Sequence, residues 1–222
     1  MYSVELVTRI TLLGLAAAAC LVAQKEHPPW EVRRERMMRL PEVYSRMGLK
    51  EGSTVADVGA GGGFFTVRLA RAVGASGRVY AVDVSENALK RLRTAVKKEK
   101  LRNVTIVRGA PDDPKLTPGS IDAVLMVDAY HEMTKYREML ERMRAALKPG
   151  GRLVVIDIPA DKTRKQPRAV QEREHVLDAG LAEQEIRTAG FEIMERDDRF
   201  VDPPDSETVL WLIVARPPPR EP

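Results

Sequence analysis

The chain has 222 residues, 44% of them hydrophobic and 31% charged, with 36 basic and 32 acidic side chains that leave a net charge of +4. This balance is ordinary for a folded domain and argues against a disordered chain or a polytopic membrane protein. Basic and acidic residues alternate along most of the sequence, without interleaved aromatic residues, so we expect no nucleic-acid partner. The single cysteine, Cys20, excludes an intrachain disulfide.

The amino terminus, residues 1–24, contains an uncharged apolar run from Ile10 to Ala23. This run is shorter than the ~20 residues of a membrane-spanning helix and fits the apolar core of a secretory signal. We interpret residues 1–24 as a signal-like or membrane-anchor segment, with a buried or amphipathic first helix as the alternative. The segment therefore raises the expectation of membrane association.

Residues 25–50 follow as an N-terminal helical extension. Pro28 and Pro29 interrupt the chain, and apolar residues then recur at spacings of three and four up to about residue 46. Such spacing predicts helix with one apolar face, which we expect to pack on the following domain.

Residues 51–216 form the main domain and alternate between short apolar runs and helical patterns. Helices are expected at 63–73, from Ser85 onward and from Thr134 to a proline-glycine stop. The expected strands are 53–58, 77–84, 103–109, 121–128 and 152–158. Strand-helix alternation predicts a doubly wound α/β domain with a mostly parallel sheet.

After residue 158 the pattern changes. A basic loop, 161–168, is expected to be a solvated linker, or alternatively to face an anionic substrate. A helix over 169–189 then precedes two runs, 191–201 and 207–216, joined by a turn too short for a crossover helix. These runs predict an antiparallel pair, which completes a Rossmann-like sheet of seven strands with an antiparallel last strand. Residues 217–222 are a tail.

A glycine-rich turn, "VADVGAGGGFF", follows the first strand at residues 55–65. Glycines there permit positive φ and close approach of a ligand to the main chain. Their register is G-x-G-x-G from Gly59, which lacks the last glycine of a dinucleotide fingerprint. Asp83 closes the second strand, where its two oxygens can accept both hydroxyls of a ribose. The alternative is a carboxylate satisfied by backbone amides beside Ser85.

Four stretches, "VADVGAGGG", "YAVDVS", "IDAVLMVDAYHEM" and "LKPGGRLVVID", together resemble the class I S-adenosylmethionine-dependent methyltransferases, in the group that includes quinone-biosynthesis enzymes. The resemblance implies S-adenosyl-L-methionine as cofactor and a small-molecule methyl acceptor. Two other functions stay open: a non-catalytic nucleotide-binding or membrane-associated module on the same fold, and a nicotinamide-dependent dehydrogenase. Because this cofactor is made in the cytosol, we favour the cytoplasmic face of the membrane over export as the location.

The resemblance also assigns roles to single residues. The amino-acid part of the cofactor falls to Asp57 and the loop 59–63, the ribose to the end of the second strand, and the sulfonium end to the fourth strand. Many relatives hold the adenine with an acidic residue where this chain has Ala110, and Asp112 can replace it. The implied cofactor residues are Asp57, Gly59, Ala60, Gly61, Gly63, Asp83, Val84, Asp112 and Asp128.

His131 and Glu132 lie just past the fourth strand, where the methyl group should emerge. A histidine can act as a base near neutral pH, so both are candidate catalytic residues; the alternative is that His131 positions a loop or caps a helix. His175 either lines the acceptor pocket or occupies a surface helix position. Since His27, His131 and His175 are far apart in the sequence, we expect no metal site. The oligomeric state is not predicted.

Overall fold

The computed structural model describes residues 29–202 and 209–219, and the chain divides into two compact units, residues 1–36 and 37–222. Residues 29–36, all but the last residue of helix α1 (Pro29–Met37), are the described part of the first unit. The signal-like segment 1–24 lies outside the described residues. Among the residues that are described, no helix is both long and apolar enough to cross a membrane.

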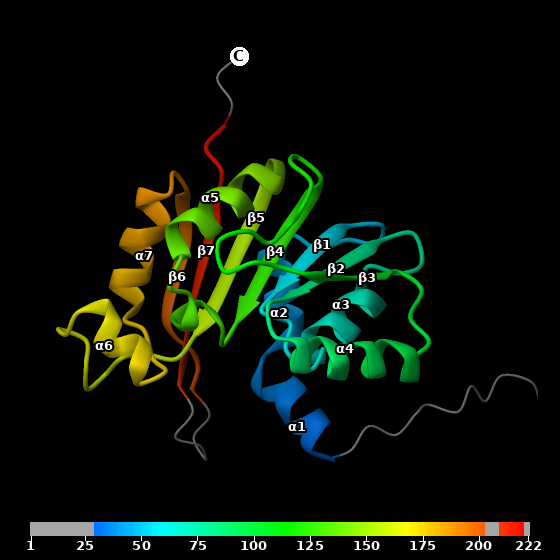
Figure 1. The fold of residues 1–222 in the computed structure, drawn as a ribbon, viewed down its shortest axis with the longest axis horizontal. Helices are drawn as coiled ribbons and strands as arrows, with labels where there is room; N and C mark the ends of the chain where they lie inside the picture. Colours follow the sequence, from blue (N-terminus) through cyan, green and yellow to red (C-terminus); the bar gives the residue numbers. More distant parts are fainter. Residues whose placement is uncertain (1–28, 203–208, 220–222) are drawn as a thin grey trace, which may run out of the picture. The chain divides into compact units, whose positions relative to one another are not determined.

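A seven-stranded sheet forms the centre of the second unit, in the order β3-β2-β1-β4-β5-β7-β6 (Figure 1). Its strands are β1 (Thr54–Val58), β2 (Arg78–Asp83), β3 (Val104–Arg108), β4 (Ile121–Val127), β5 (Leu147–Asp157), β6 (Glu192–Val201) and β7 (Leu210–Arg216). The first five strands pair in parallel, whereas β7 runs antiparallel to both β5 and β6. The predicted fold class and the antiparallel last strand are confirmed.

Helices cover both faces of this sheet because successive strand residues point to opposite sides. Val55 belongs to the core on one face, with α2 (Leu40–Met47) and α3 (Phe64–Ala72), and α4 (Glu86–Lys98) packs on the same side. Ala56 belongs to the core on the other face, with α5 (Tyr136–Ala146) and α7 (Ala179–Thr188). Ser85 caps α4 as expected, since its hydroxyl accepts the N–H of Ala88.

The extension predicted for residues 25–50 contains α1 and α2, and its apolar face is visible at α2. Leu40, Val43 and Met47 are buried in the sheet's core. The proposed boundary between extension and main domain at residues 50 and 51 stays a prediction.

The helix from Thr134 was predicted too long at its end. α5 ends at Ala146, and Leu147 already pairs with Ile121 as the first residue of β5. The pairing then shifts, so that Ala123 lies opposite Arg152. The proline-glycine segment between these pairs is therefore an irregularity within a strand rather than the end of a helix.

The single helix expected over 169–189 is wrong, because the chain breaks between α6 (Arg168–Arg173) and α7. The N–H of Leu177 donates to the carbonyl of Ile158 just past β5, and Asp178 caps the start of α7. The basic loop before α6 is partly neutralised, since Arg164 and Arg168 form ion pairs with Asp178 and Glu185.

Candidate functional site

A cavity of about 480 Å³ lies beyond the carboxyl ends of β1, β2 and β4. Ligands of open α/β sheets bind in this position. The lining comes from the glycine turn, the ends of β2 and β4, the start of α4 and the turn η1 (Tyr130–Glu132). The lining residues are Val58, Gly59, Gly61, Val82, Asp83, Val84, Ser85, Ala88, Arg91, Ala110, Pro111, Asp128, Ala129, Glu132, Met133, Thr134 and Met139.

Two glycines of the turn serve different purposes. Gly59 has φ of +78°, and a Cβ there would lie 2.4 Å from the Cβ of Ala129, so glycine lets the turn approach the segment after β4. Gly61 has φ of +55°, and no described atom lies within 4 Å of the position that its Cβ would take. The main chain at Gly61 is therefore open to a ligand.

Asp83 joins the end of β2 to this turn. Its Oδ2 accepts the N–H of Gly61 at 2.8 Å, and its Oδ1 accepts the N–H of Ser85 at 2.8 Å. Backbone amides therefore do bond to this carboxylate, as the alternative interpretation of Asp83 expected. A carboxylate has about four acceptor positions, so Asp83 keeps capacity for further donors at the cavity it lines. Its role toward a ribose stays a prediction.

Three other predicted cofactor residues shape the turn and do not appear in the cavity lining. Asp57 is buried and accepts a hydrogen bond from the Thr66 hydroxyl at 2.5 Å; burial raises its pKa to about 6, although Thr66 opposes the shift. Ala60 is nearly buried and donates its N–H to Val82. Gly63 begins α3 with φ of +90°, and a Cβ there would clash with Leu92.

The expected adenine contact is placed differently by the structure. Ala110 and Pro111 line the cavity. Backbone hydrogen bonds between Ala110 and Asp113 close a turn that leaves Asp112 exposed, outside the cavity lining. The structure therefore does not bring Asp112 to the cavity. Sequence reasoning also missed Arg91, Met133, Thr134 and Met139 of the lining, which carry no motif by themselves.

The segment after β4 places the candidate catalytic residues at the cavity's other end. Asp128 and Glu132 line the cavity and are exposed, as is Val84 at the β2 end. His131 is buried, with its backbone N–H and its Nδ1 on the two oxygens of Asp157, at 2.9 and 2.7 Å. Burial lowers the pKa of His131, but the hydrogen bond and charge of Asp157, with Asp128 and Glu132, outweigh it and raise the pKa.

Asp157 is a site residue that sequence reasoning missed. It is fully buried at the carboxyl end of β5 and also accepts the N–H of Ile158 at 2.8 Å. The available signal was its position, because Asp83 and Asp128 likewise follow or close apolar strands at the same edge of the sheet. Asp157 fixes the orientation of His131. The catalytic role of His131 and its alternative, positioning a loop or capping a helix, both stay predictions.

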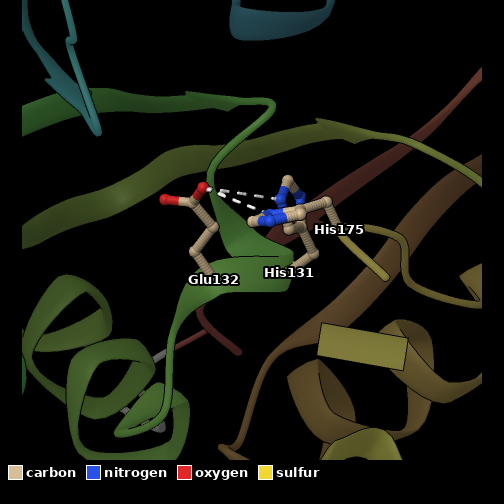
Figure 2. A group of neighbouring side chains, drawn as sticks. All are labelled: His131, Glu132 and His175. Atoms are coloured by element: carbon tan, nitrogen blue, oxygen red, sulfur yellow. Dashed lines mark ion pairs between the residues drawn. The ribbon is translucent and has the colours of Figure 1, made fainter. Parts of the chain in front are cut away.

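Two of the histidines that are far apart in the sequence lie together in the structure. His131 and His175 lie edge to face with ring centroids 5.8 Å apart. His175 is exposed and follows α6 with φ of +54°, in the break between α6 and α7. Glu132 faces both rings, with its Oε1 3.8 Å from His131 Nε2 and 3.7 Å from His175 Nδ1 (Figure 2). His27 lies outside the described residues.

The sheet order, the glycine turn after β1 and the carboxylate at the end of β2 are typical of Rossmann-like domains, which bind nucleoside cofactors at their strand ends. Residues 55–151 match the family of methyltransferase domains. These residues form a methyltransferase domain of the class I S-adenosylmethionine-dependent type, as the sequence motifs indicated.

Named relatives agree with this class. The demethylmenaquinone methyltransferases of Listeria welshimeri and Lactococcus lactis are 30% and 31% identical over 137 residues, which is 62% of this chain. The chain covers 54% and 51% of their lengths, about half of each relative. A crystal structure of an S-adenosylmethionine-dependent methyltransferase from Aquifex aeolicus is 26% identical, with a TM-score of 0.69 over 86% of this chain and 98% of that one.

Proposed function

We propose that the protein is an S-adenosylmethionine-dependent methyltransferase that acts on a small-molecule acceptor. One observation carries the proposal: the Asp83 carboxylate holds the amide of Gly61, and both residues line the same cavity at the strand ends. The methyltransferase-domain match over residues 55–151 supports it.

The residues present fit the cofactor. Gly61 leaves open main chain where no Cβ intervenes, and Asp83 has acceptor positions for the two ribose hydroxyls. Ala110 and Pro111 offer a small, mostly apolar surface for the adenine of the cofactor. The bound cofactor supplies a methyl group on a sulfonium, which an acceptor atom displaces in line. The protein's contribution is mainly to hold the two reactants close and aligned.

The acceptor is expected at the end of the cavity formed by the segment after β4. Asp128, Glu132 and Met133 line this end, so acidic and apolar surfaces meet there. A proton acceptor is needed only if the methyl acceptor loses a proton. Glu132 reaches the cavity directly, whereas His131 lies buried behind it and is held by Asp157. We assign proton removal to Glu132 and His131, with Glu132 in contact with the methyl acceptor.

Calorimetry tests the cofactor. We expect the purified chain to bind S-adenosylmethionine and to give no heat of binding when NAD or NADP is added. Nicotinamide binding without S-adenosylmethionine binding would contradict the proposal and favour the dehydrogenase alternative. Radiolabelled methyl transfer then tests acceptors, with quinones first because the relatives' name contains one, followed by lipids, amines, thiols and arsenite. Cofactor binding without transfer to any acceptor would favour a non-catalytic module.

For location, we propose the cytoplasmic face of the membrane, with residues 10–23 as the attachment. The support is the apolar run in the sequence and the cytosolic source of the cofactor. Fractionation combined with amino-terminal sequencing of the mature protein tests this. Recovery of a shortened chain outside the cytoplasm would instead show export.

A further inference from the structure

Three side chains with metal-ligating atoms lie close together (Figure 2). They are His131 and Glu132 of the turn η1 and His175 of the break between α6 and α7, and one ligand atom from each lies within 4.8 Å of the other two. Two imidazoles and one carboxylate are a donor set that binds divalent transition metals, including catalytic zinc. Glu132 belongs both to this cluster and to the cavity lining.

His131 is oriented as a metal-ligating histidine usually is. Asp157 accepts two backbone N–H groups, from His131 and Ile158, so it acts as an acceptor and the proton of the imidazole lies on Nδ1. Nε2 then keeps its lone pair on the side of Glu132. A carboxylate that holds the second nitrogen of a ligating histidine fixes the tautomer and the ring and raises the affinity for the metal.

The spacing of the ligand atoms suits an ion with small adjustments. Glu132 Oε1 lies 3.8 Å from His131 Nε2 and 3.7 Å from His175 Nδ1. Atoms bound to one tetrahedral zinc at ~2.1 Å lie about 3.4 Å from each other, so these two separations have to shorten by a few tenths of an ångström. The two imidazole nitrogens lie within 4.8 Å of each other and have to reach the same spacing. The Glu132 and His175 side chains are 63% and 72% exposed, so they have room to move.

A second group, Asp128, His131 and Asp157, also brings three ligand atoms together. In that group the histidine offers Nδ1, which lies 4.0 Å from Asp128 and already bonds to Asp157 at 2.7 Å. Binding an ion there would break that bond and leave buried Asp157 with fewer partners. The cluster of His131, Glu132 and His175 keeps every one of those hydrogen bonds.

We propose that His131, Glu132 and His175 bind one divalent transition-metal ion, with Zn²⁺ as the preferred ion. Three protein ligands leave an open coordination position, as in catalytic zinc sites. The role of the ion rests on the proposed function: the ion binds a hydroxyl oxygen of the methyl acceptor. The hydroxyl proton then passes to solvent, and the oxygen keeps the electron pair with which the acceptor attacks. With the ion bound, this Lewis acid replaces Glu132 and His131 in activating the acceptor.

The test is metal binding by the full chain, prepared without a histidine tag and stripped with a chelator. Zn²⁺ is titrated against a chromophoric competitor, and Co²⁺ is added in parallel to record visible absorption bands of a bound ion. We expect one ion per chain. Asp157→Asn should weaken Zn²⁺ binding about 10- to 100-fold, which is the usual effect of losing the group that hydrogen-bonds a metal-ligating histidine. His175→Ala and Glu132→Gln each remove a ligand and should weaken binding further.

Two matched variants serve as controls. Glu174→Gln changes an exposed carboxylate next to His175 but outside the cluster, and His27→Ala removes the chain's other histidine. Both should bind Zn²⁺ as the parent chain does. The proposal is overturned if binding is substoichiometric, or if His175→Ala, whose exposed side chain should not affect folding, retains the parent's affinity. Calorimetry with S-adenosylmethionine on the same samples separates this result from a failure of the proposed function, because the metal titration contains no cofactor.

Discussion

Asp83 at the end of β2 accepts the backbone N–H of Gly61 at 2.8 Å, and this single bond couples the second strand to the turn after the first. Its other oxygen holds Ser85, the residue that caps α4. One carboxylate thus sets the positions of the turn and of the next helix at the cavity. Its loss should affect the main chain around a ligand as well as direct contacts to that ligand.

Asp83→Ala should weaken S-adenosylmethionine binding at least about 10- to 100-fold, because hydrogen bonds to a charged group contribute roughly 1.5–3 kcal/mol each. Asp83→Asn keeps one acceptor oxygen and should be intermediate. Calorimetry measures the affinity, and circular dichroism checks the fold. Asp161→Ala, at an exposed aspartate of the 161–168 loop, is the control and should bind as the parent does. Unchanged affinity in a folded Asp83→Ala chain would refute the proposed cofactor site.

Gly59→Ala should destabilise the chain by about 2–5 kcal/mol, the sum of strain at positive φ and of overpacking. The added Cβ would lie 2.4 Å from that of Ala129. Gly119→Ala is the matched control, since Gly119 has φ of +63° with no described atom within 4 Å of its Cβ position. It should cost only about 1–2 kcal/mol. Urea unfolding measures the loss of stability in both variants. Equal losses would show that the contact with Ala129 is not the reason for glycine at position 59.

Gly61→Ala separates ligand binding from stability. Gly61 resembles Gly119 in its positive φ and in the open space around it, so both alanine variants should lose about 1–2 kcal/mol of stability. Of these two glycines, Gly61 lines the cavity and Gly119 does not. S-adenosylmethionine binding, measured by calorimetry, should therefore weaken in Gly61→Ala and remain unchanged in Gly119→Ala. Equal affinities in the two variants would mean that the main chain at Gly61 does not contact the cofactor.

The centre of the sheet was predictable because β4, the end of β5 and β7 are apolar runs buried on both faces, and α4 begins at the cap Ser85. Residues that close these strands, Asp83 and Asp128, could be placed at the cavity because carboxyl ends of parallel strands share one edge. Such inferences need only local pattern and topology.

The rest depended on contacts between segments distant in the sequence. The break that ends α6 follows from the pairing of Leu177 with Ile158, and it brings His175 beside His131. Asp112 is directed away from the cavity by the turn closed between Ala110 and Asp113. Neither the pairing nor the turn has a periodic signal, so a pattern of hydrophobicity cannot reveal them.

Asp57 gives the protein a pH-dependent stability. Burial raises its pKa from 3.8 to about 6 in the folded state, opposed by the Thr66 hydrogen bond and assisted by the charge of Asp83. Between these values the folded chain holds a proton that the unfolded chain has lost, so the free energy of unfolding falls as pH rises. The contribution of the neutral carboxyl is fully present below pH 3.8 and lost as pH rises through about 6.

Asp57→Asn removes this titration while it keeps an oxygen for the Thr66 hydroxyl. Relative to this variant, the parent chain should lose about 2.4 kcal/mol of stability between pH 4 and pH 7, because one pKa unit corresponds to about 1.4 kcal/mol and the unfolded chain is still partly protonated at pH 4. Urea unfolding of both chains at pH 4, 5, 6 and 7 measures the difference. Asp161→Asn, at an exposed site, should show no such trend. A constant difference between parent and Asp57→Asn across this range would mean that Asp57 is ionised in the folded chain throughout.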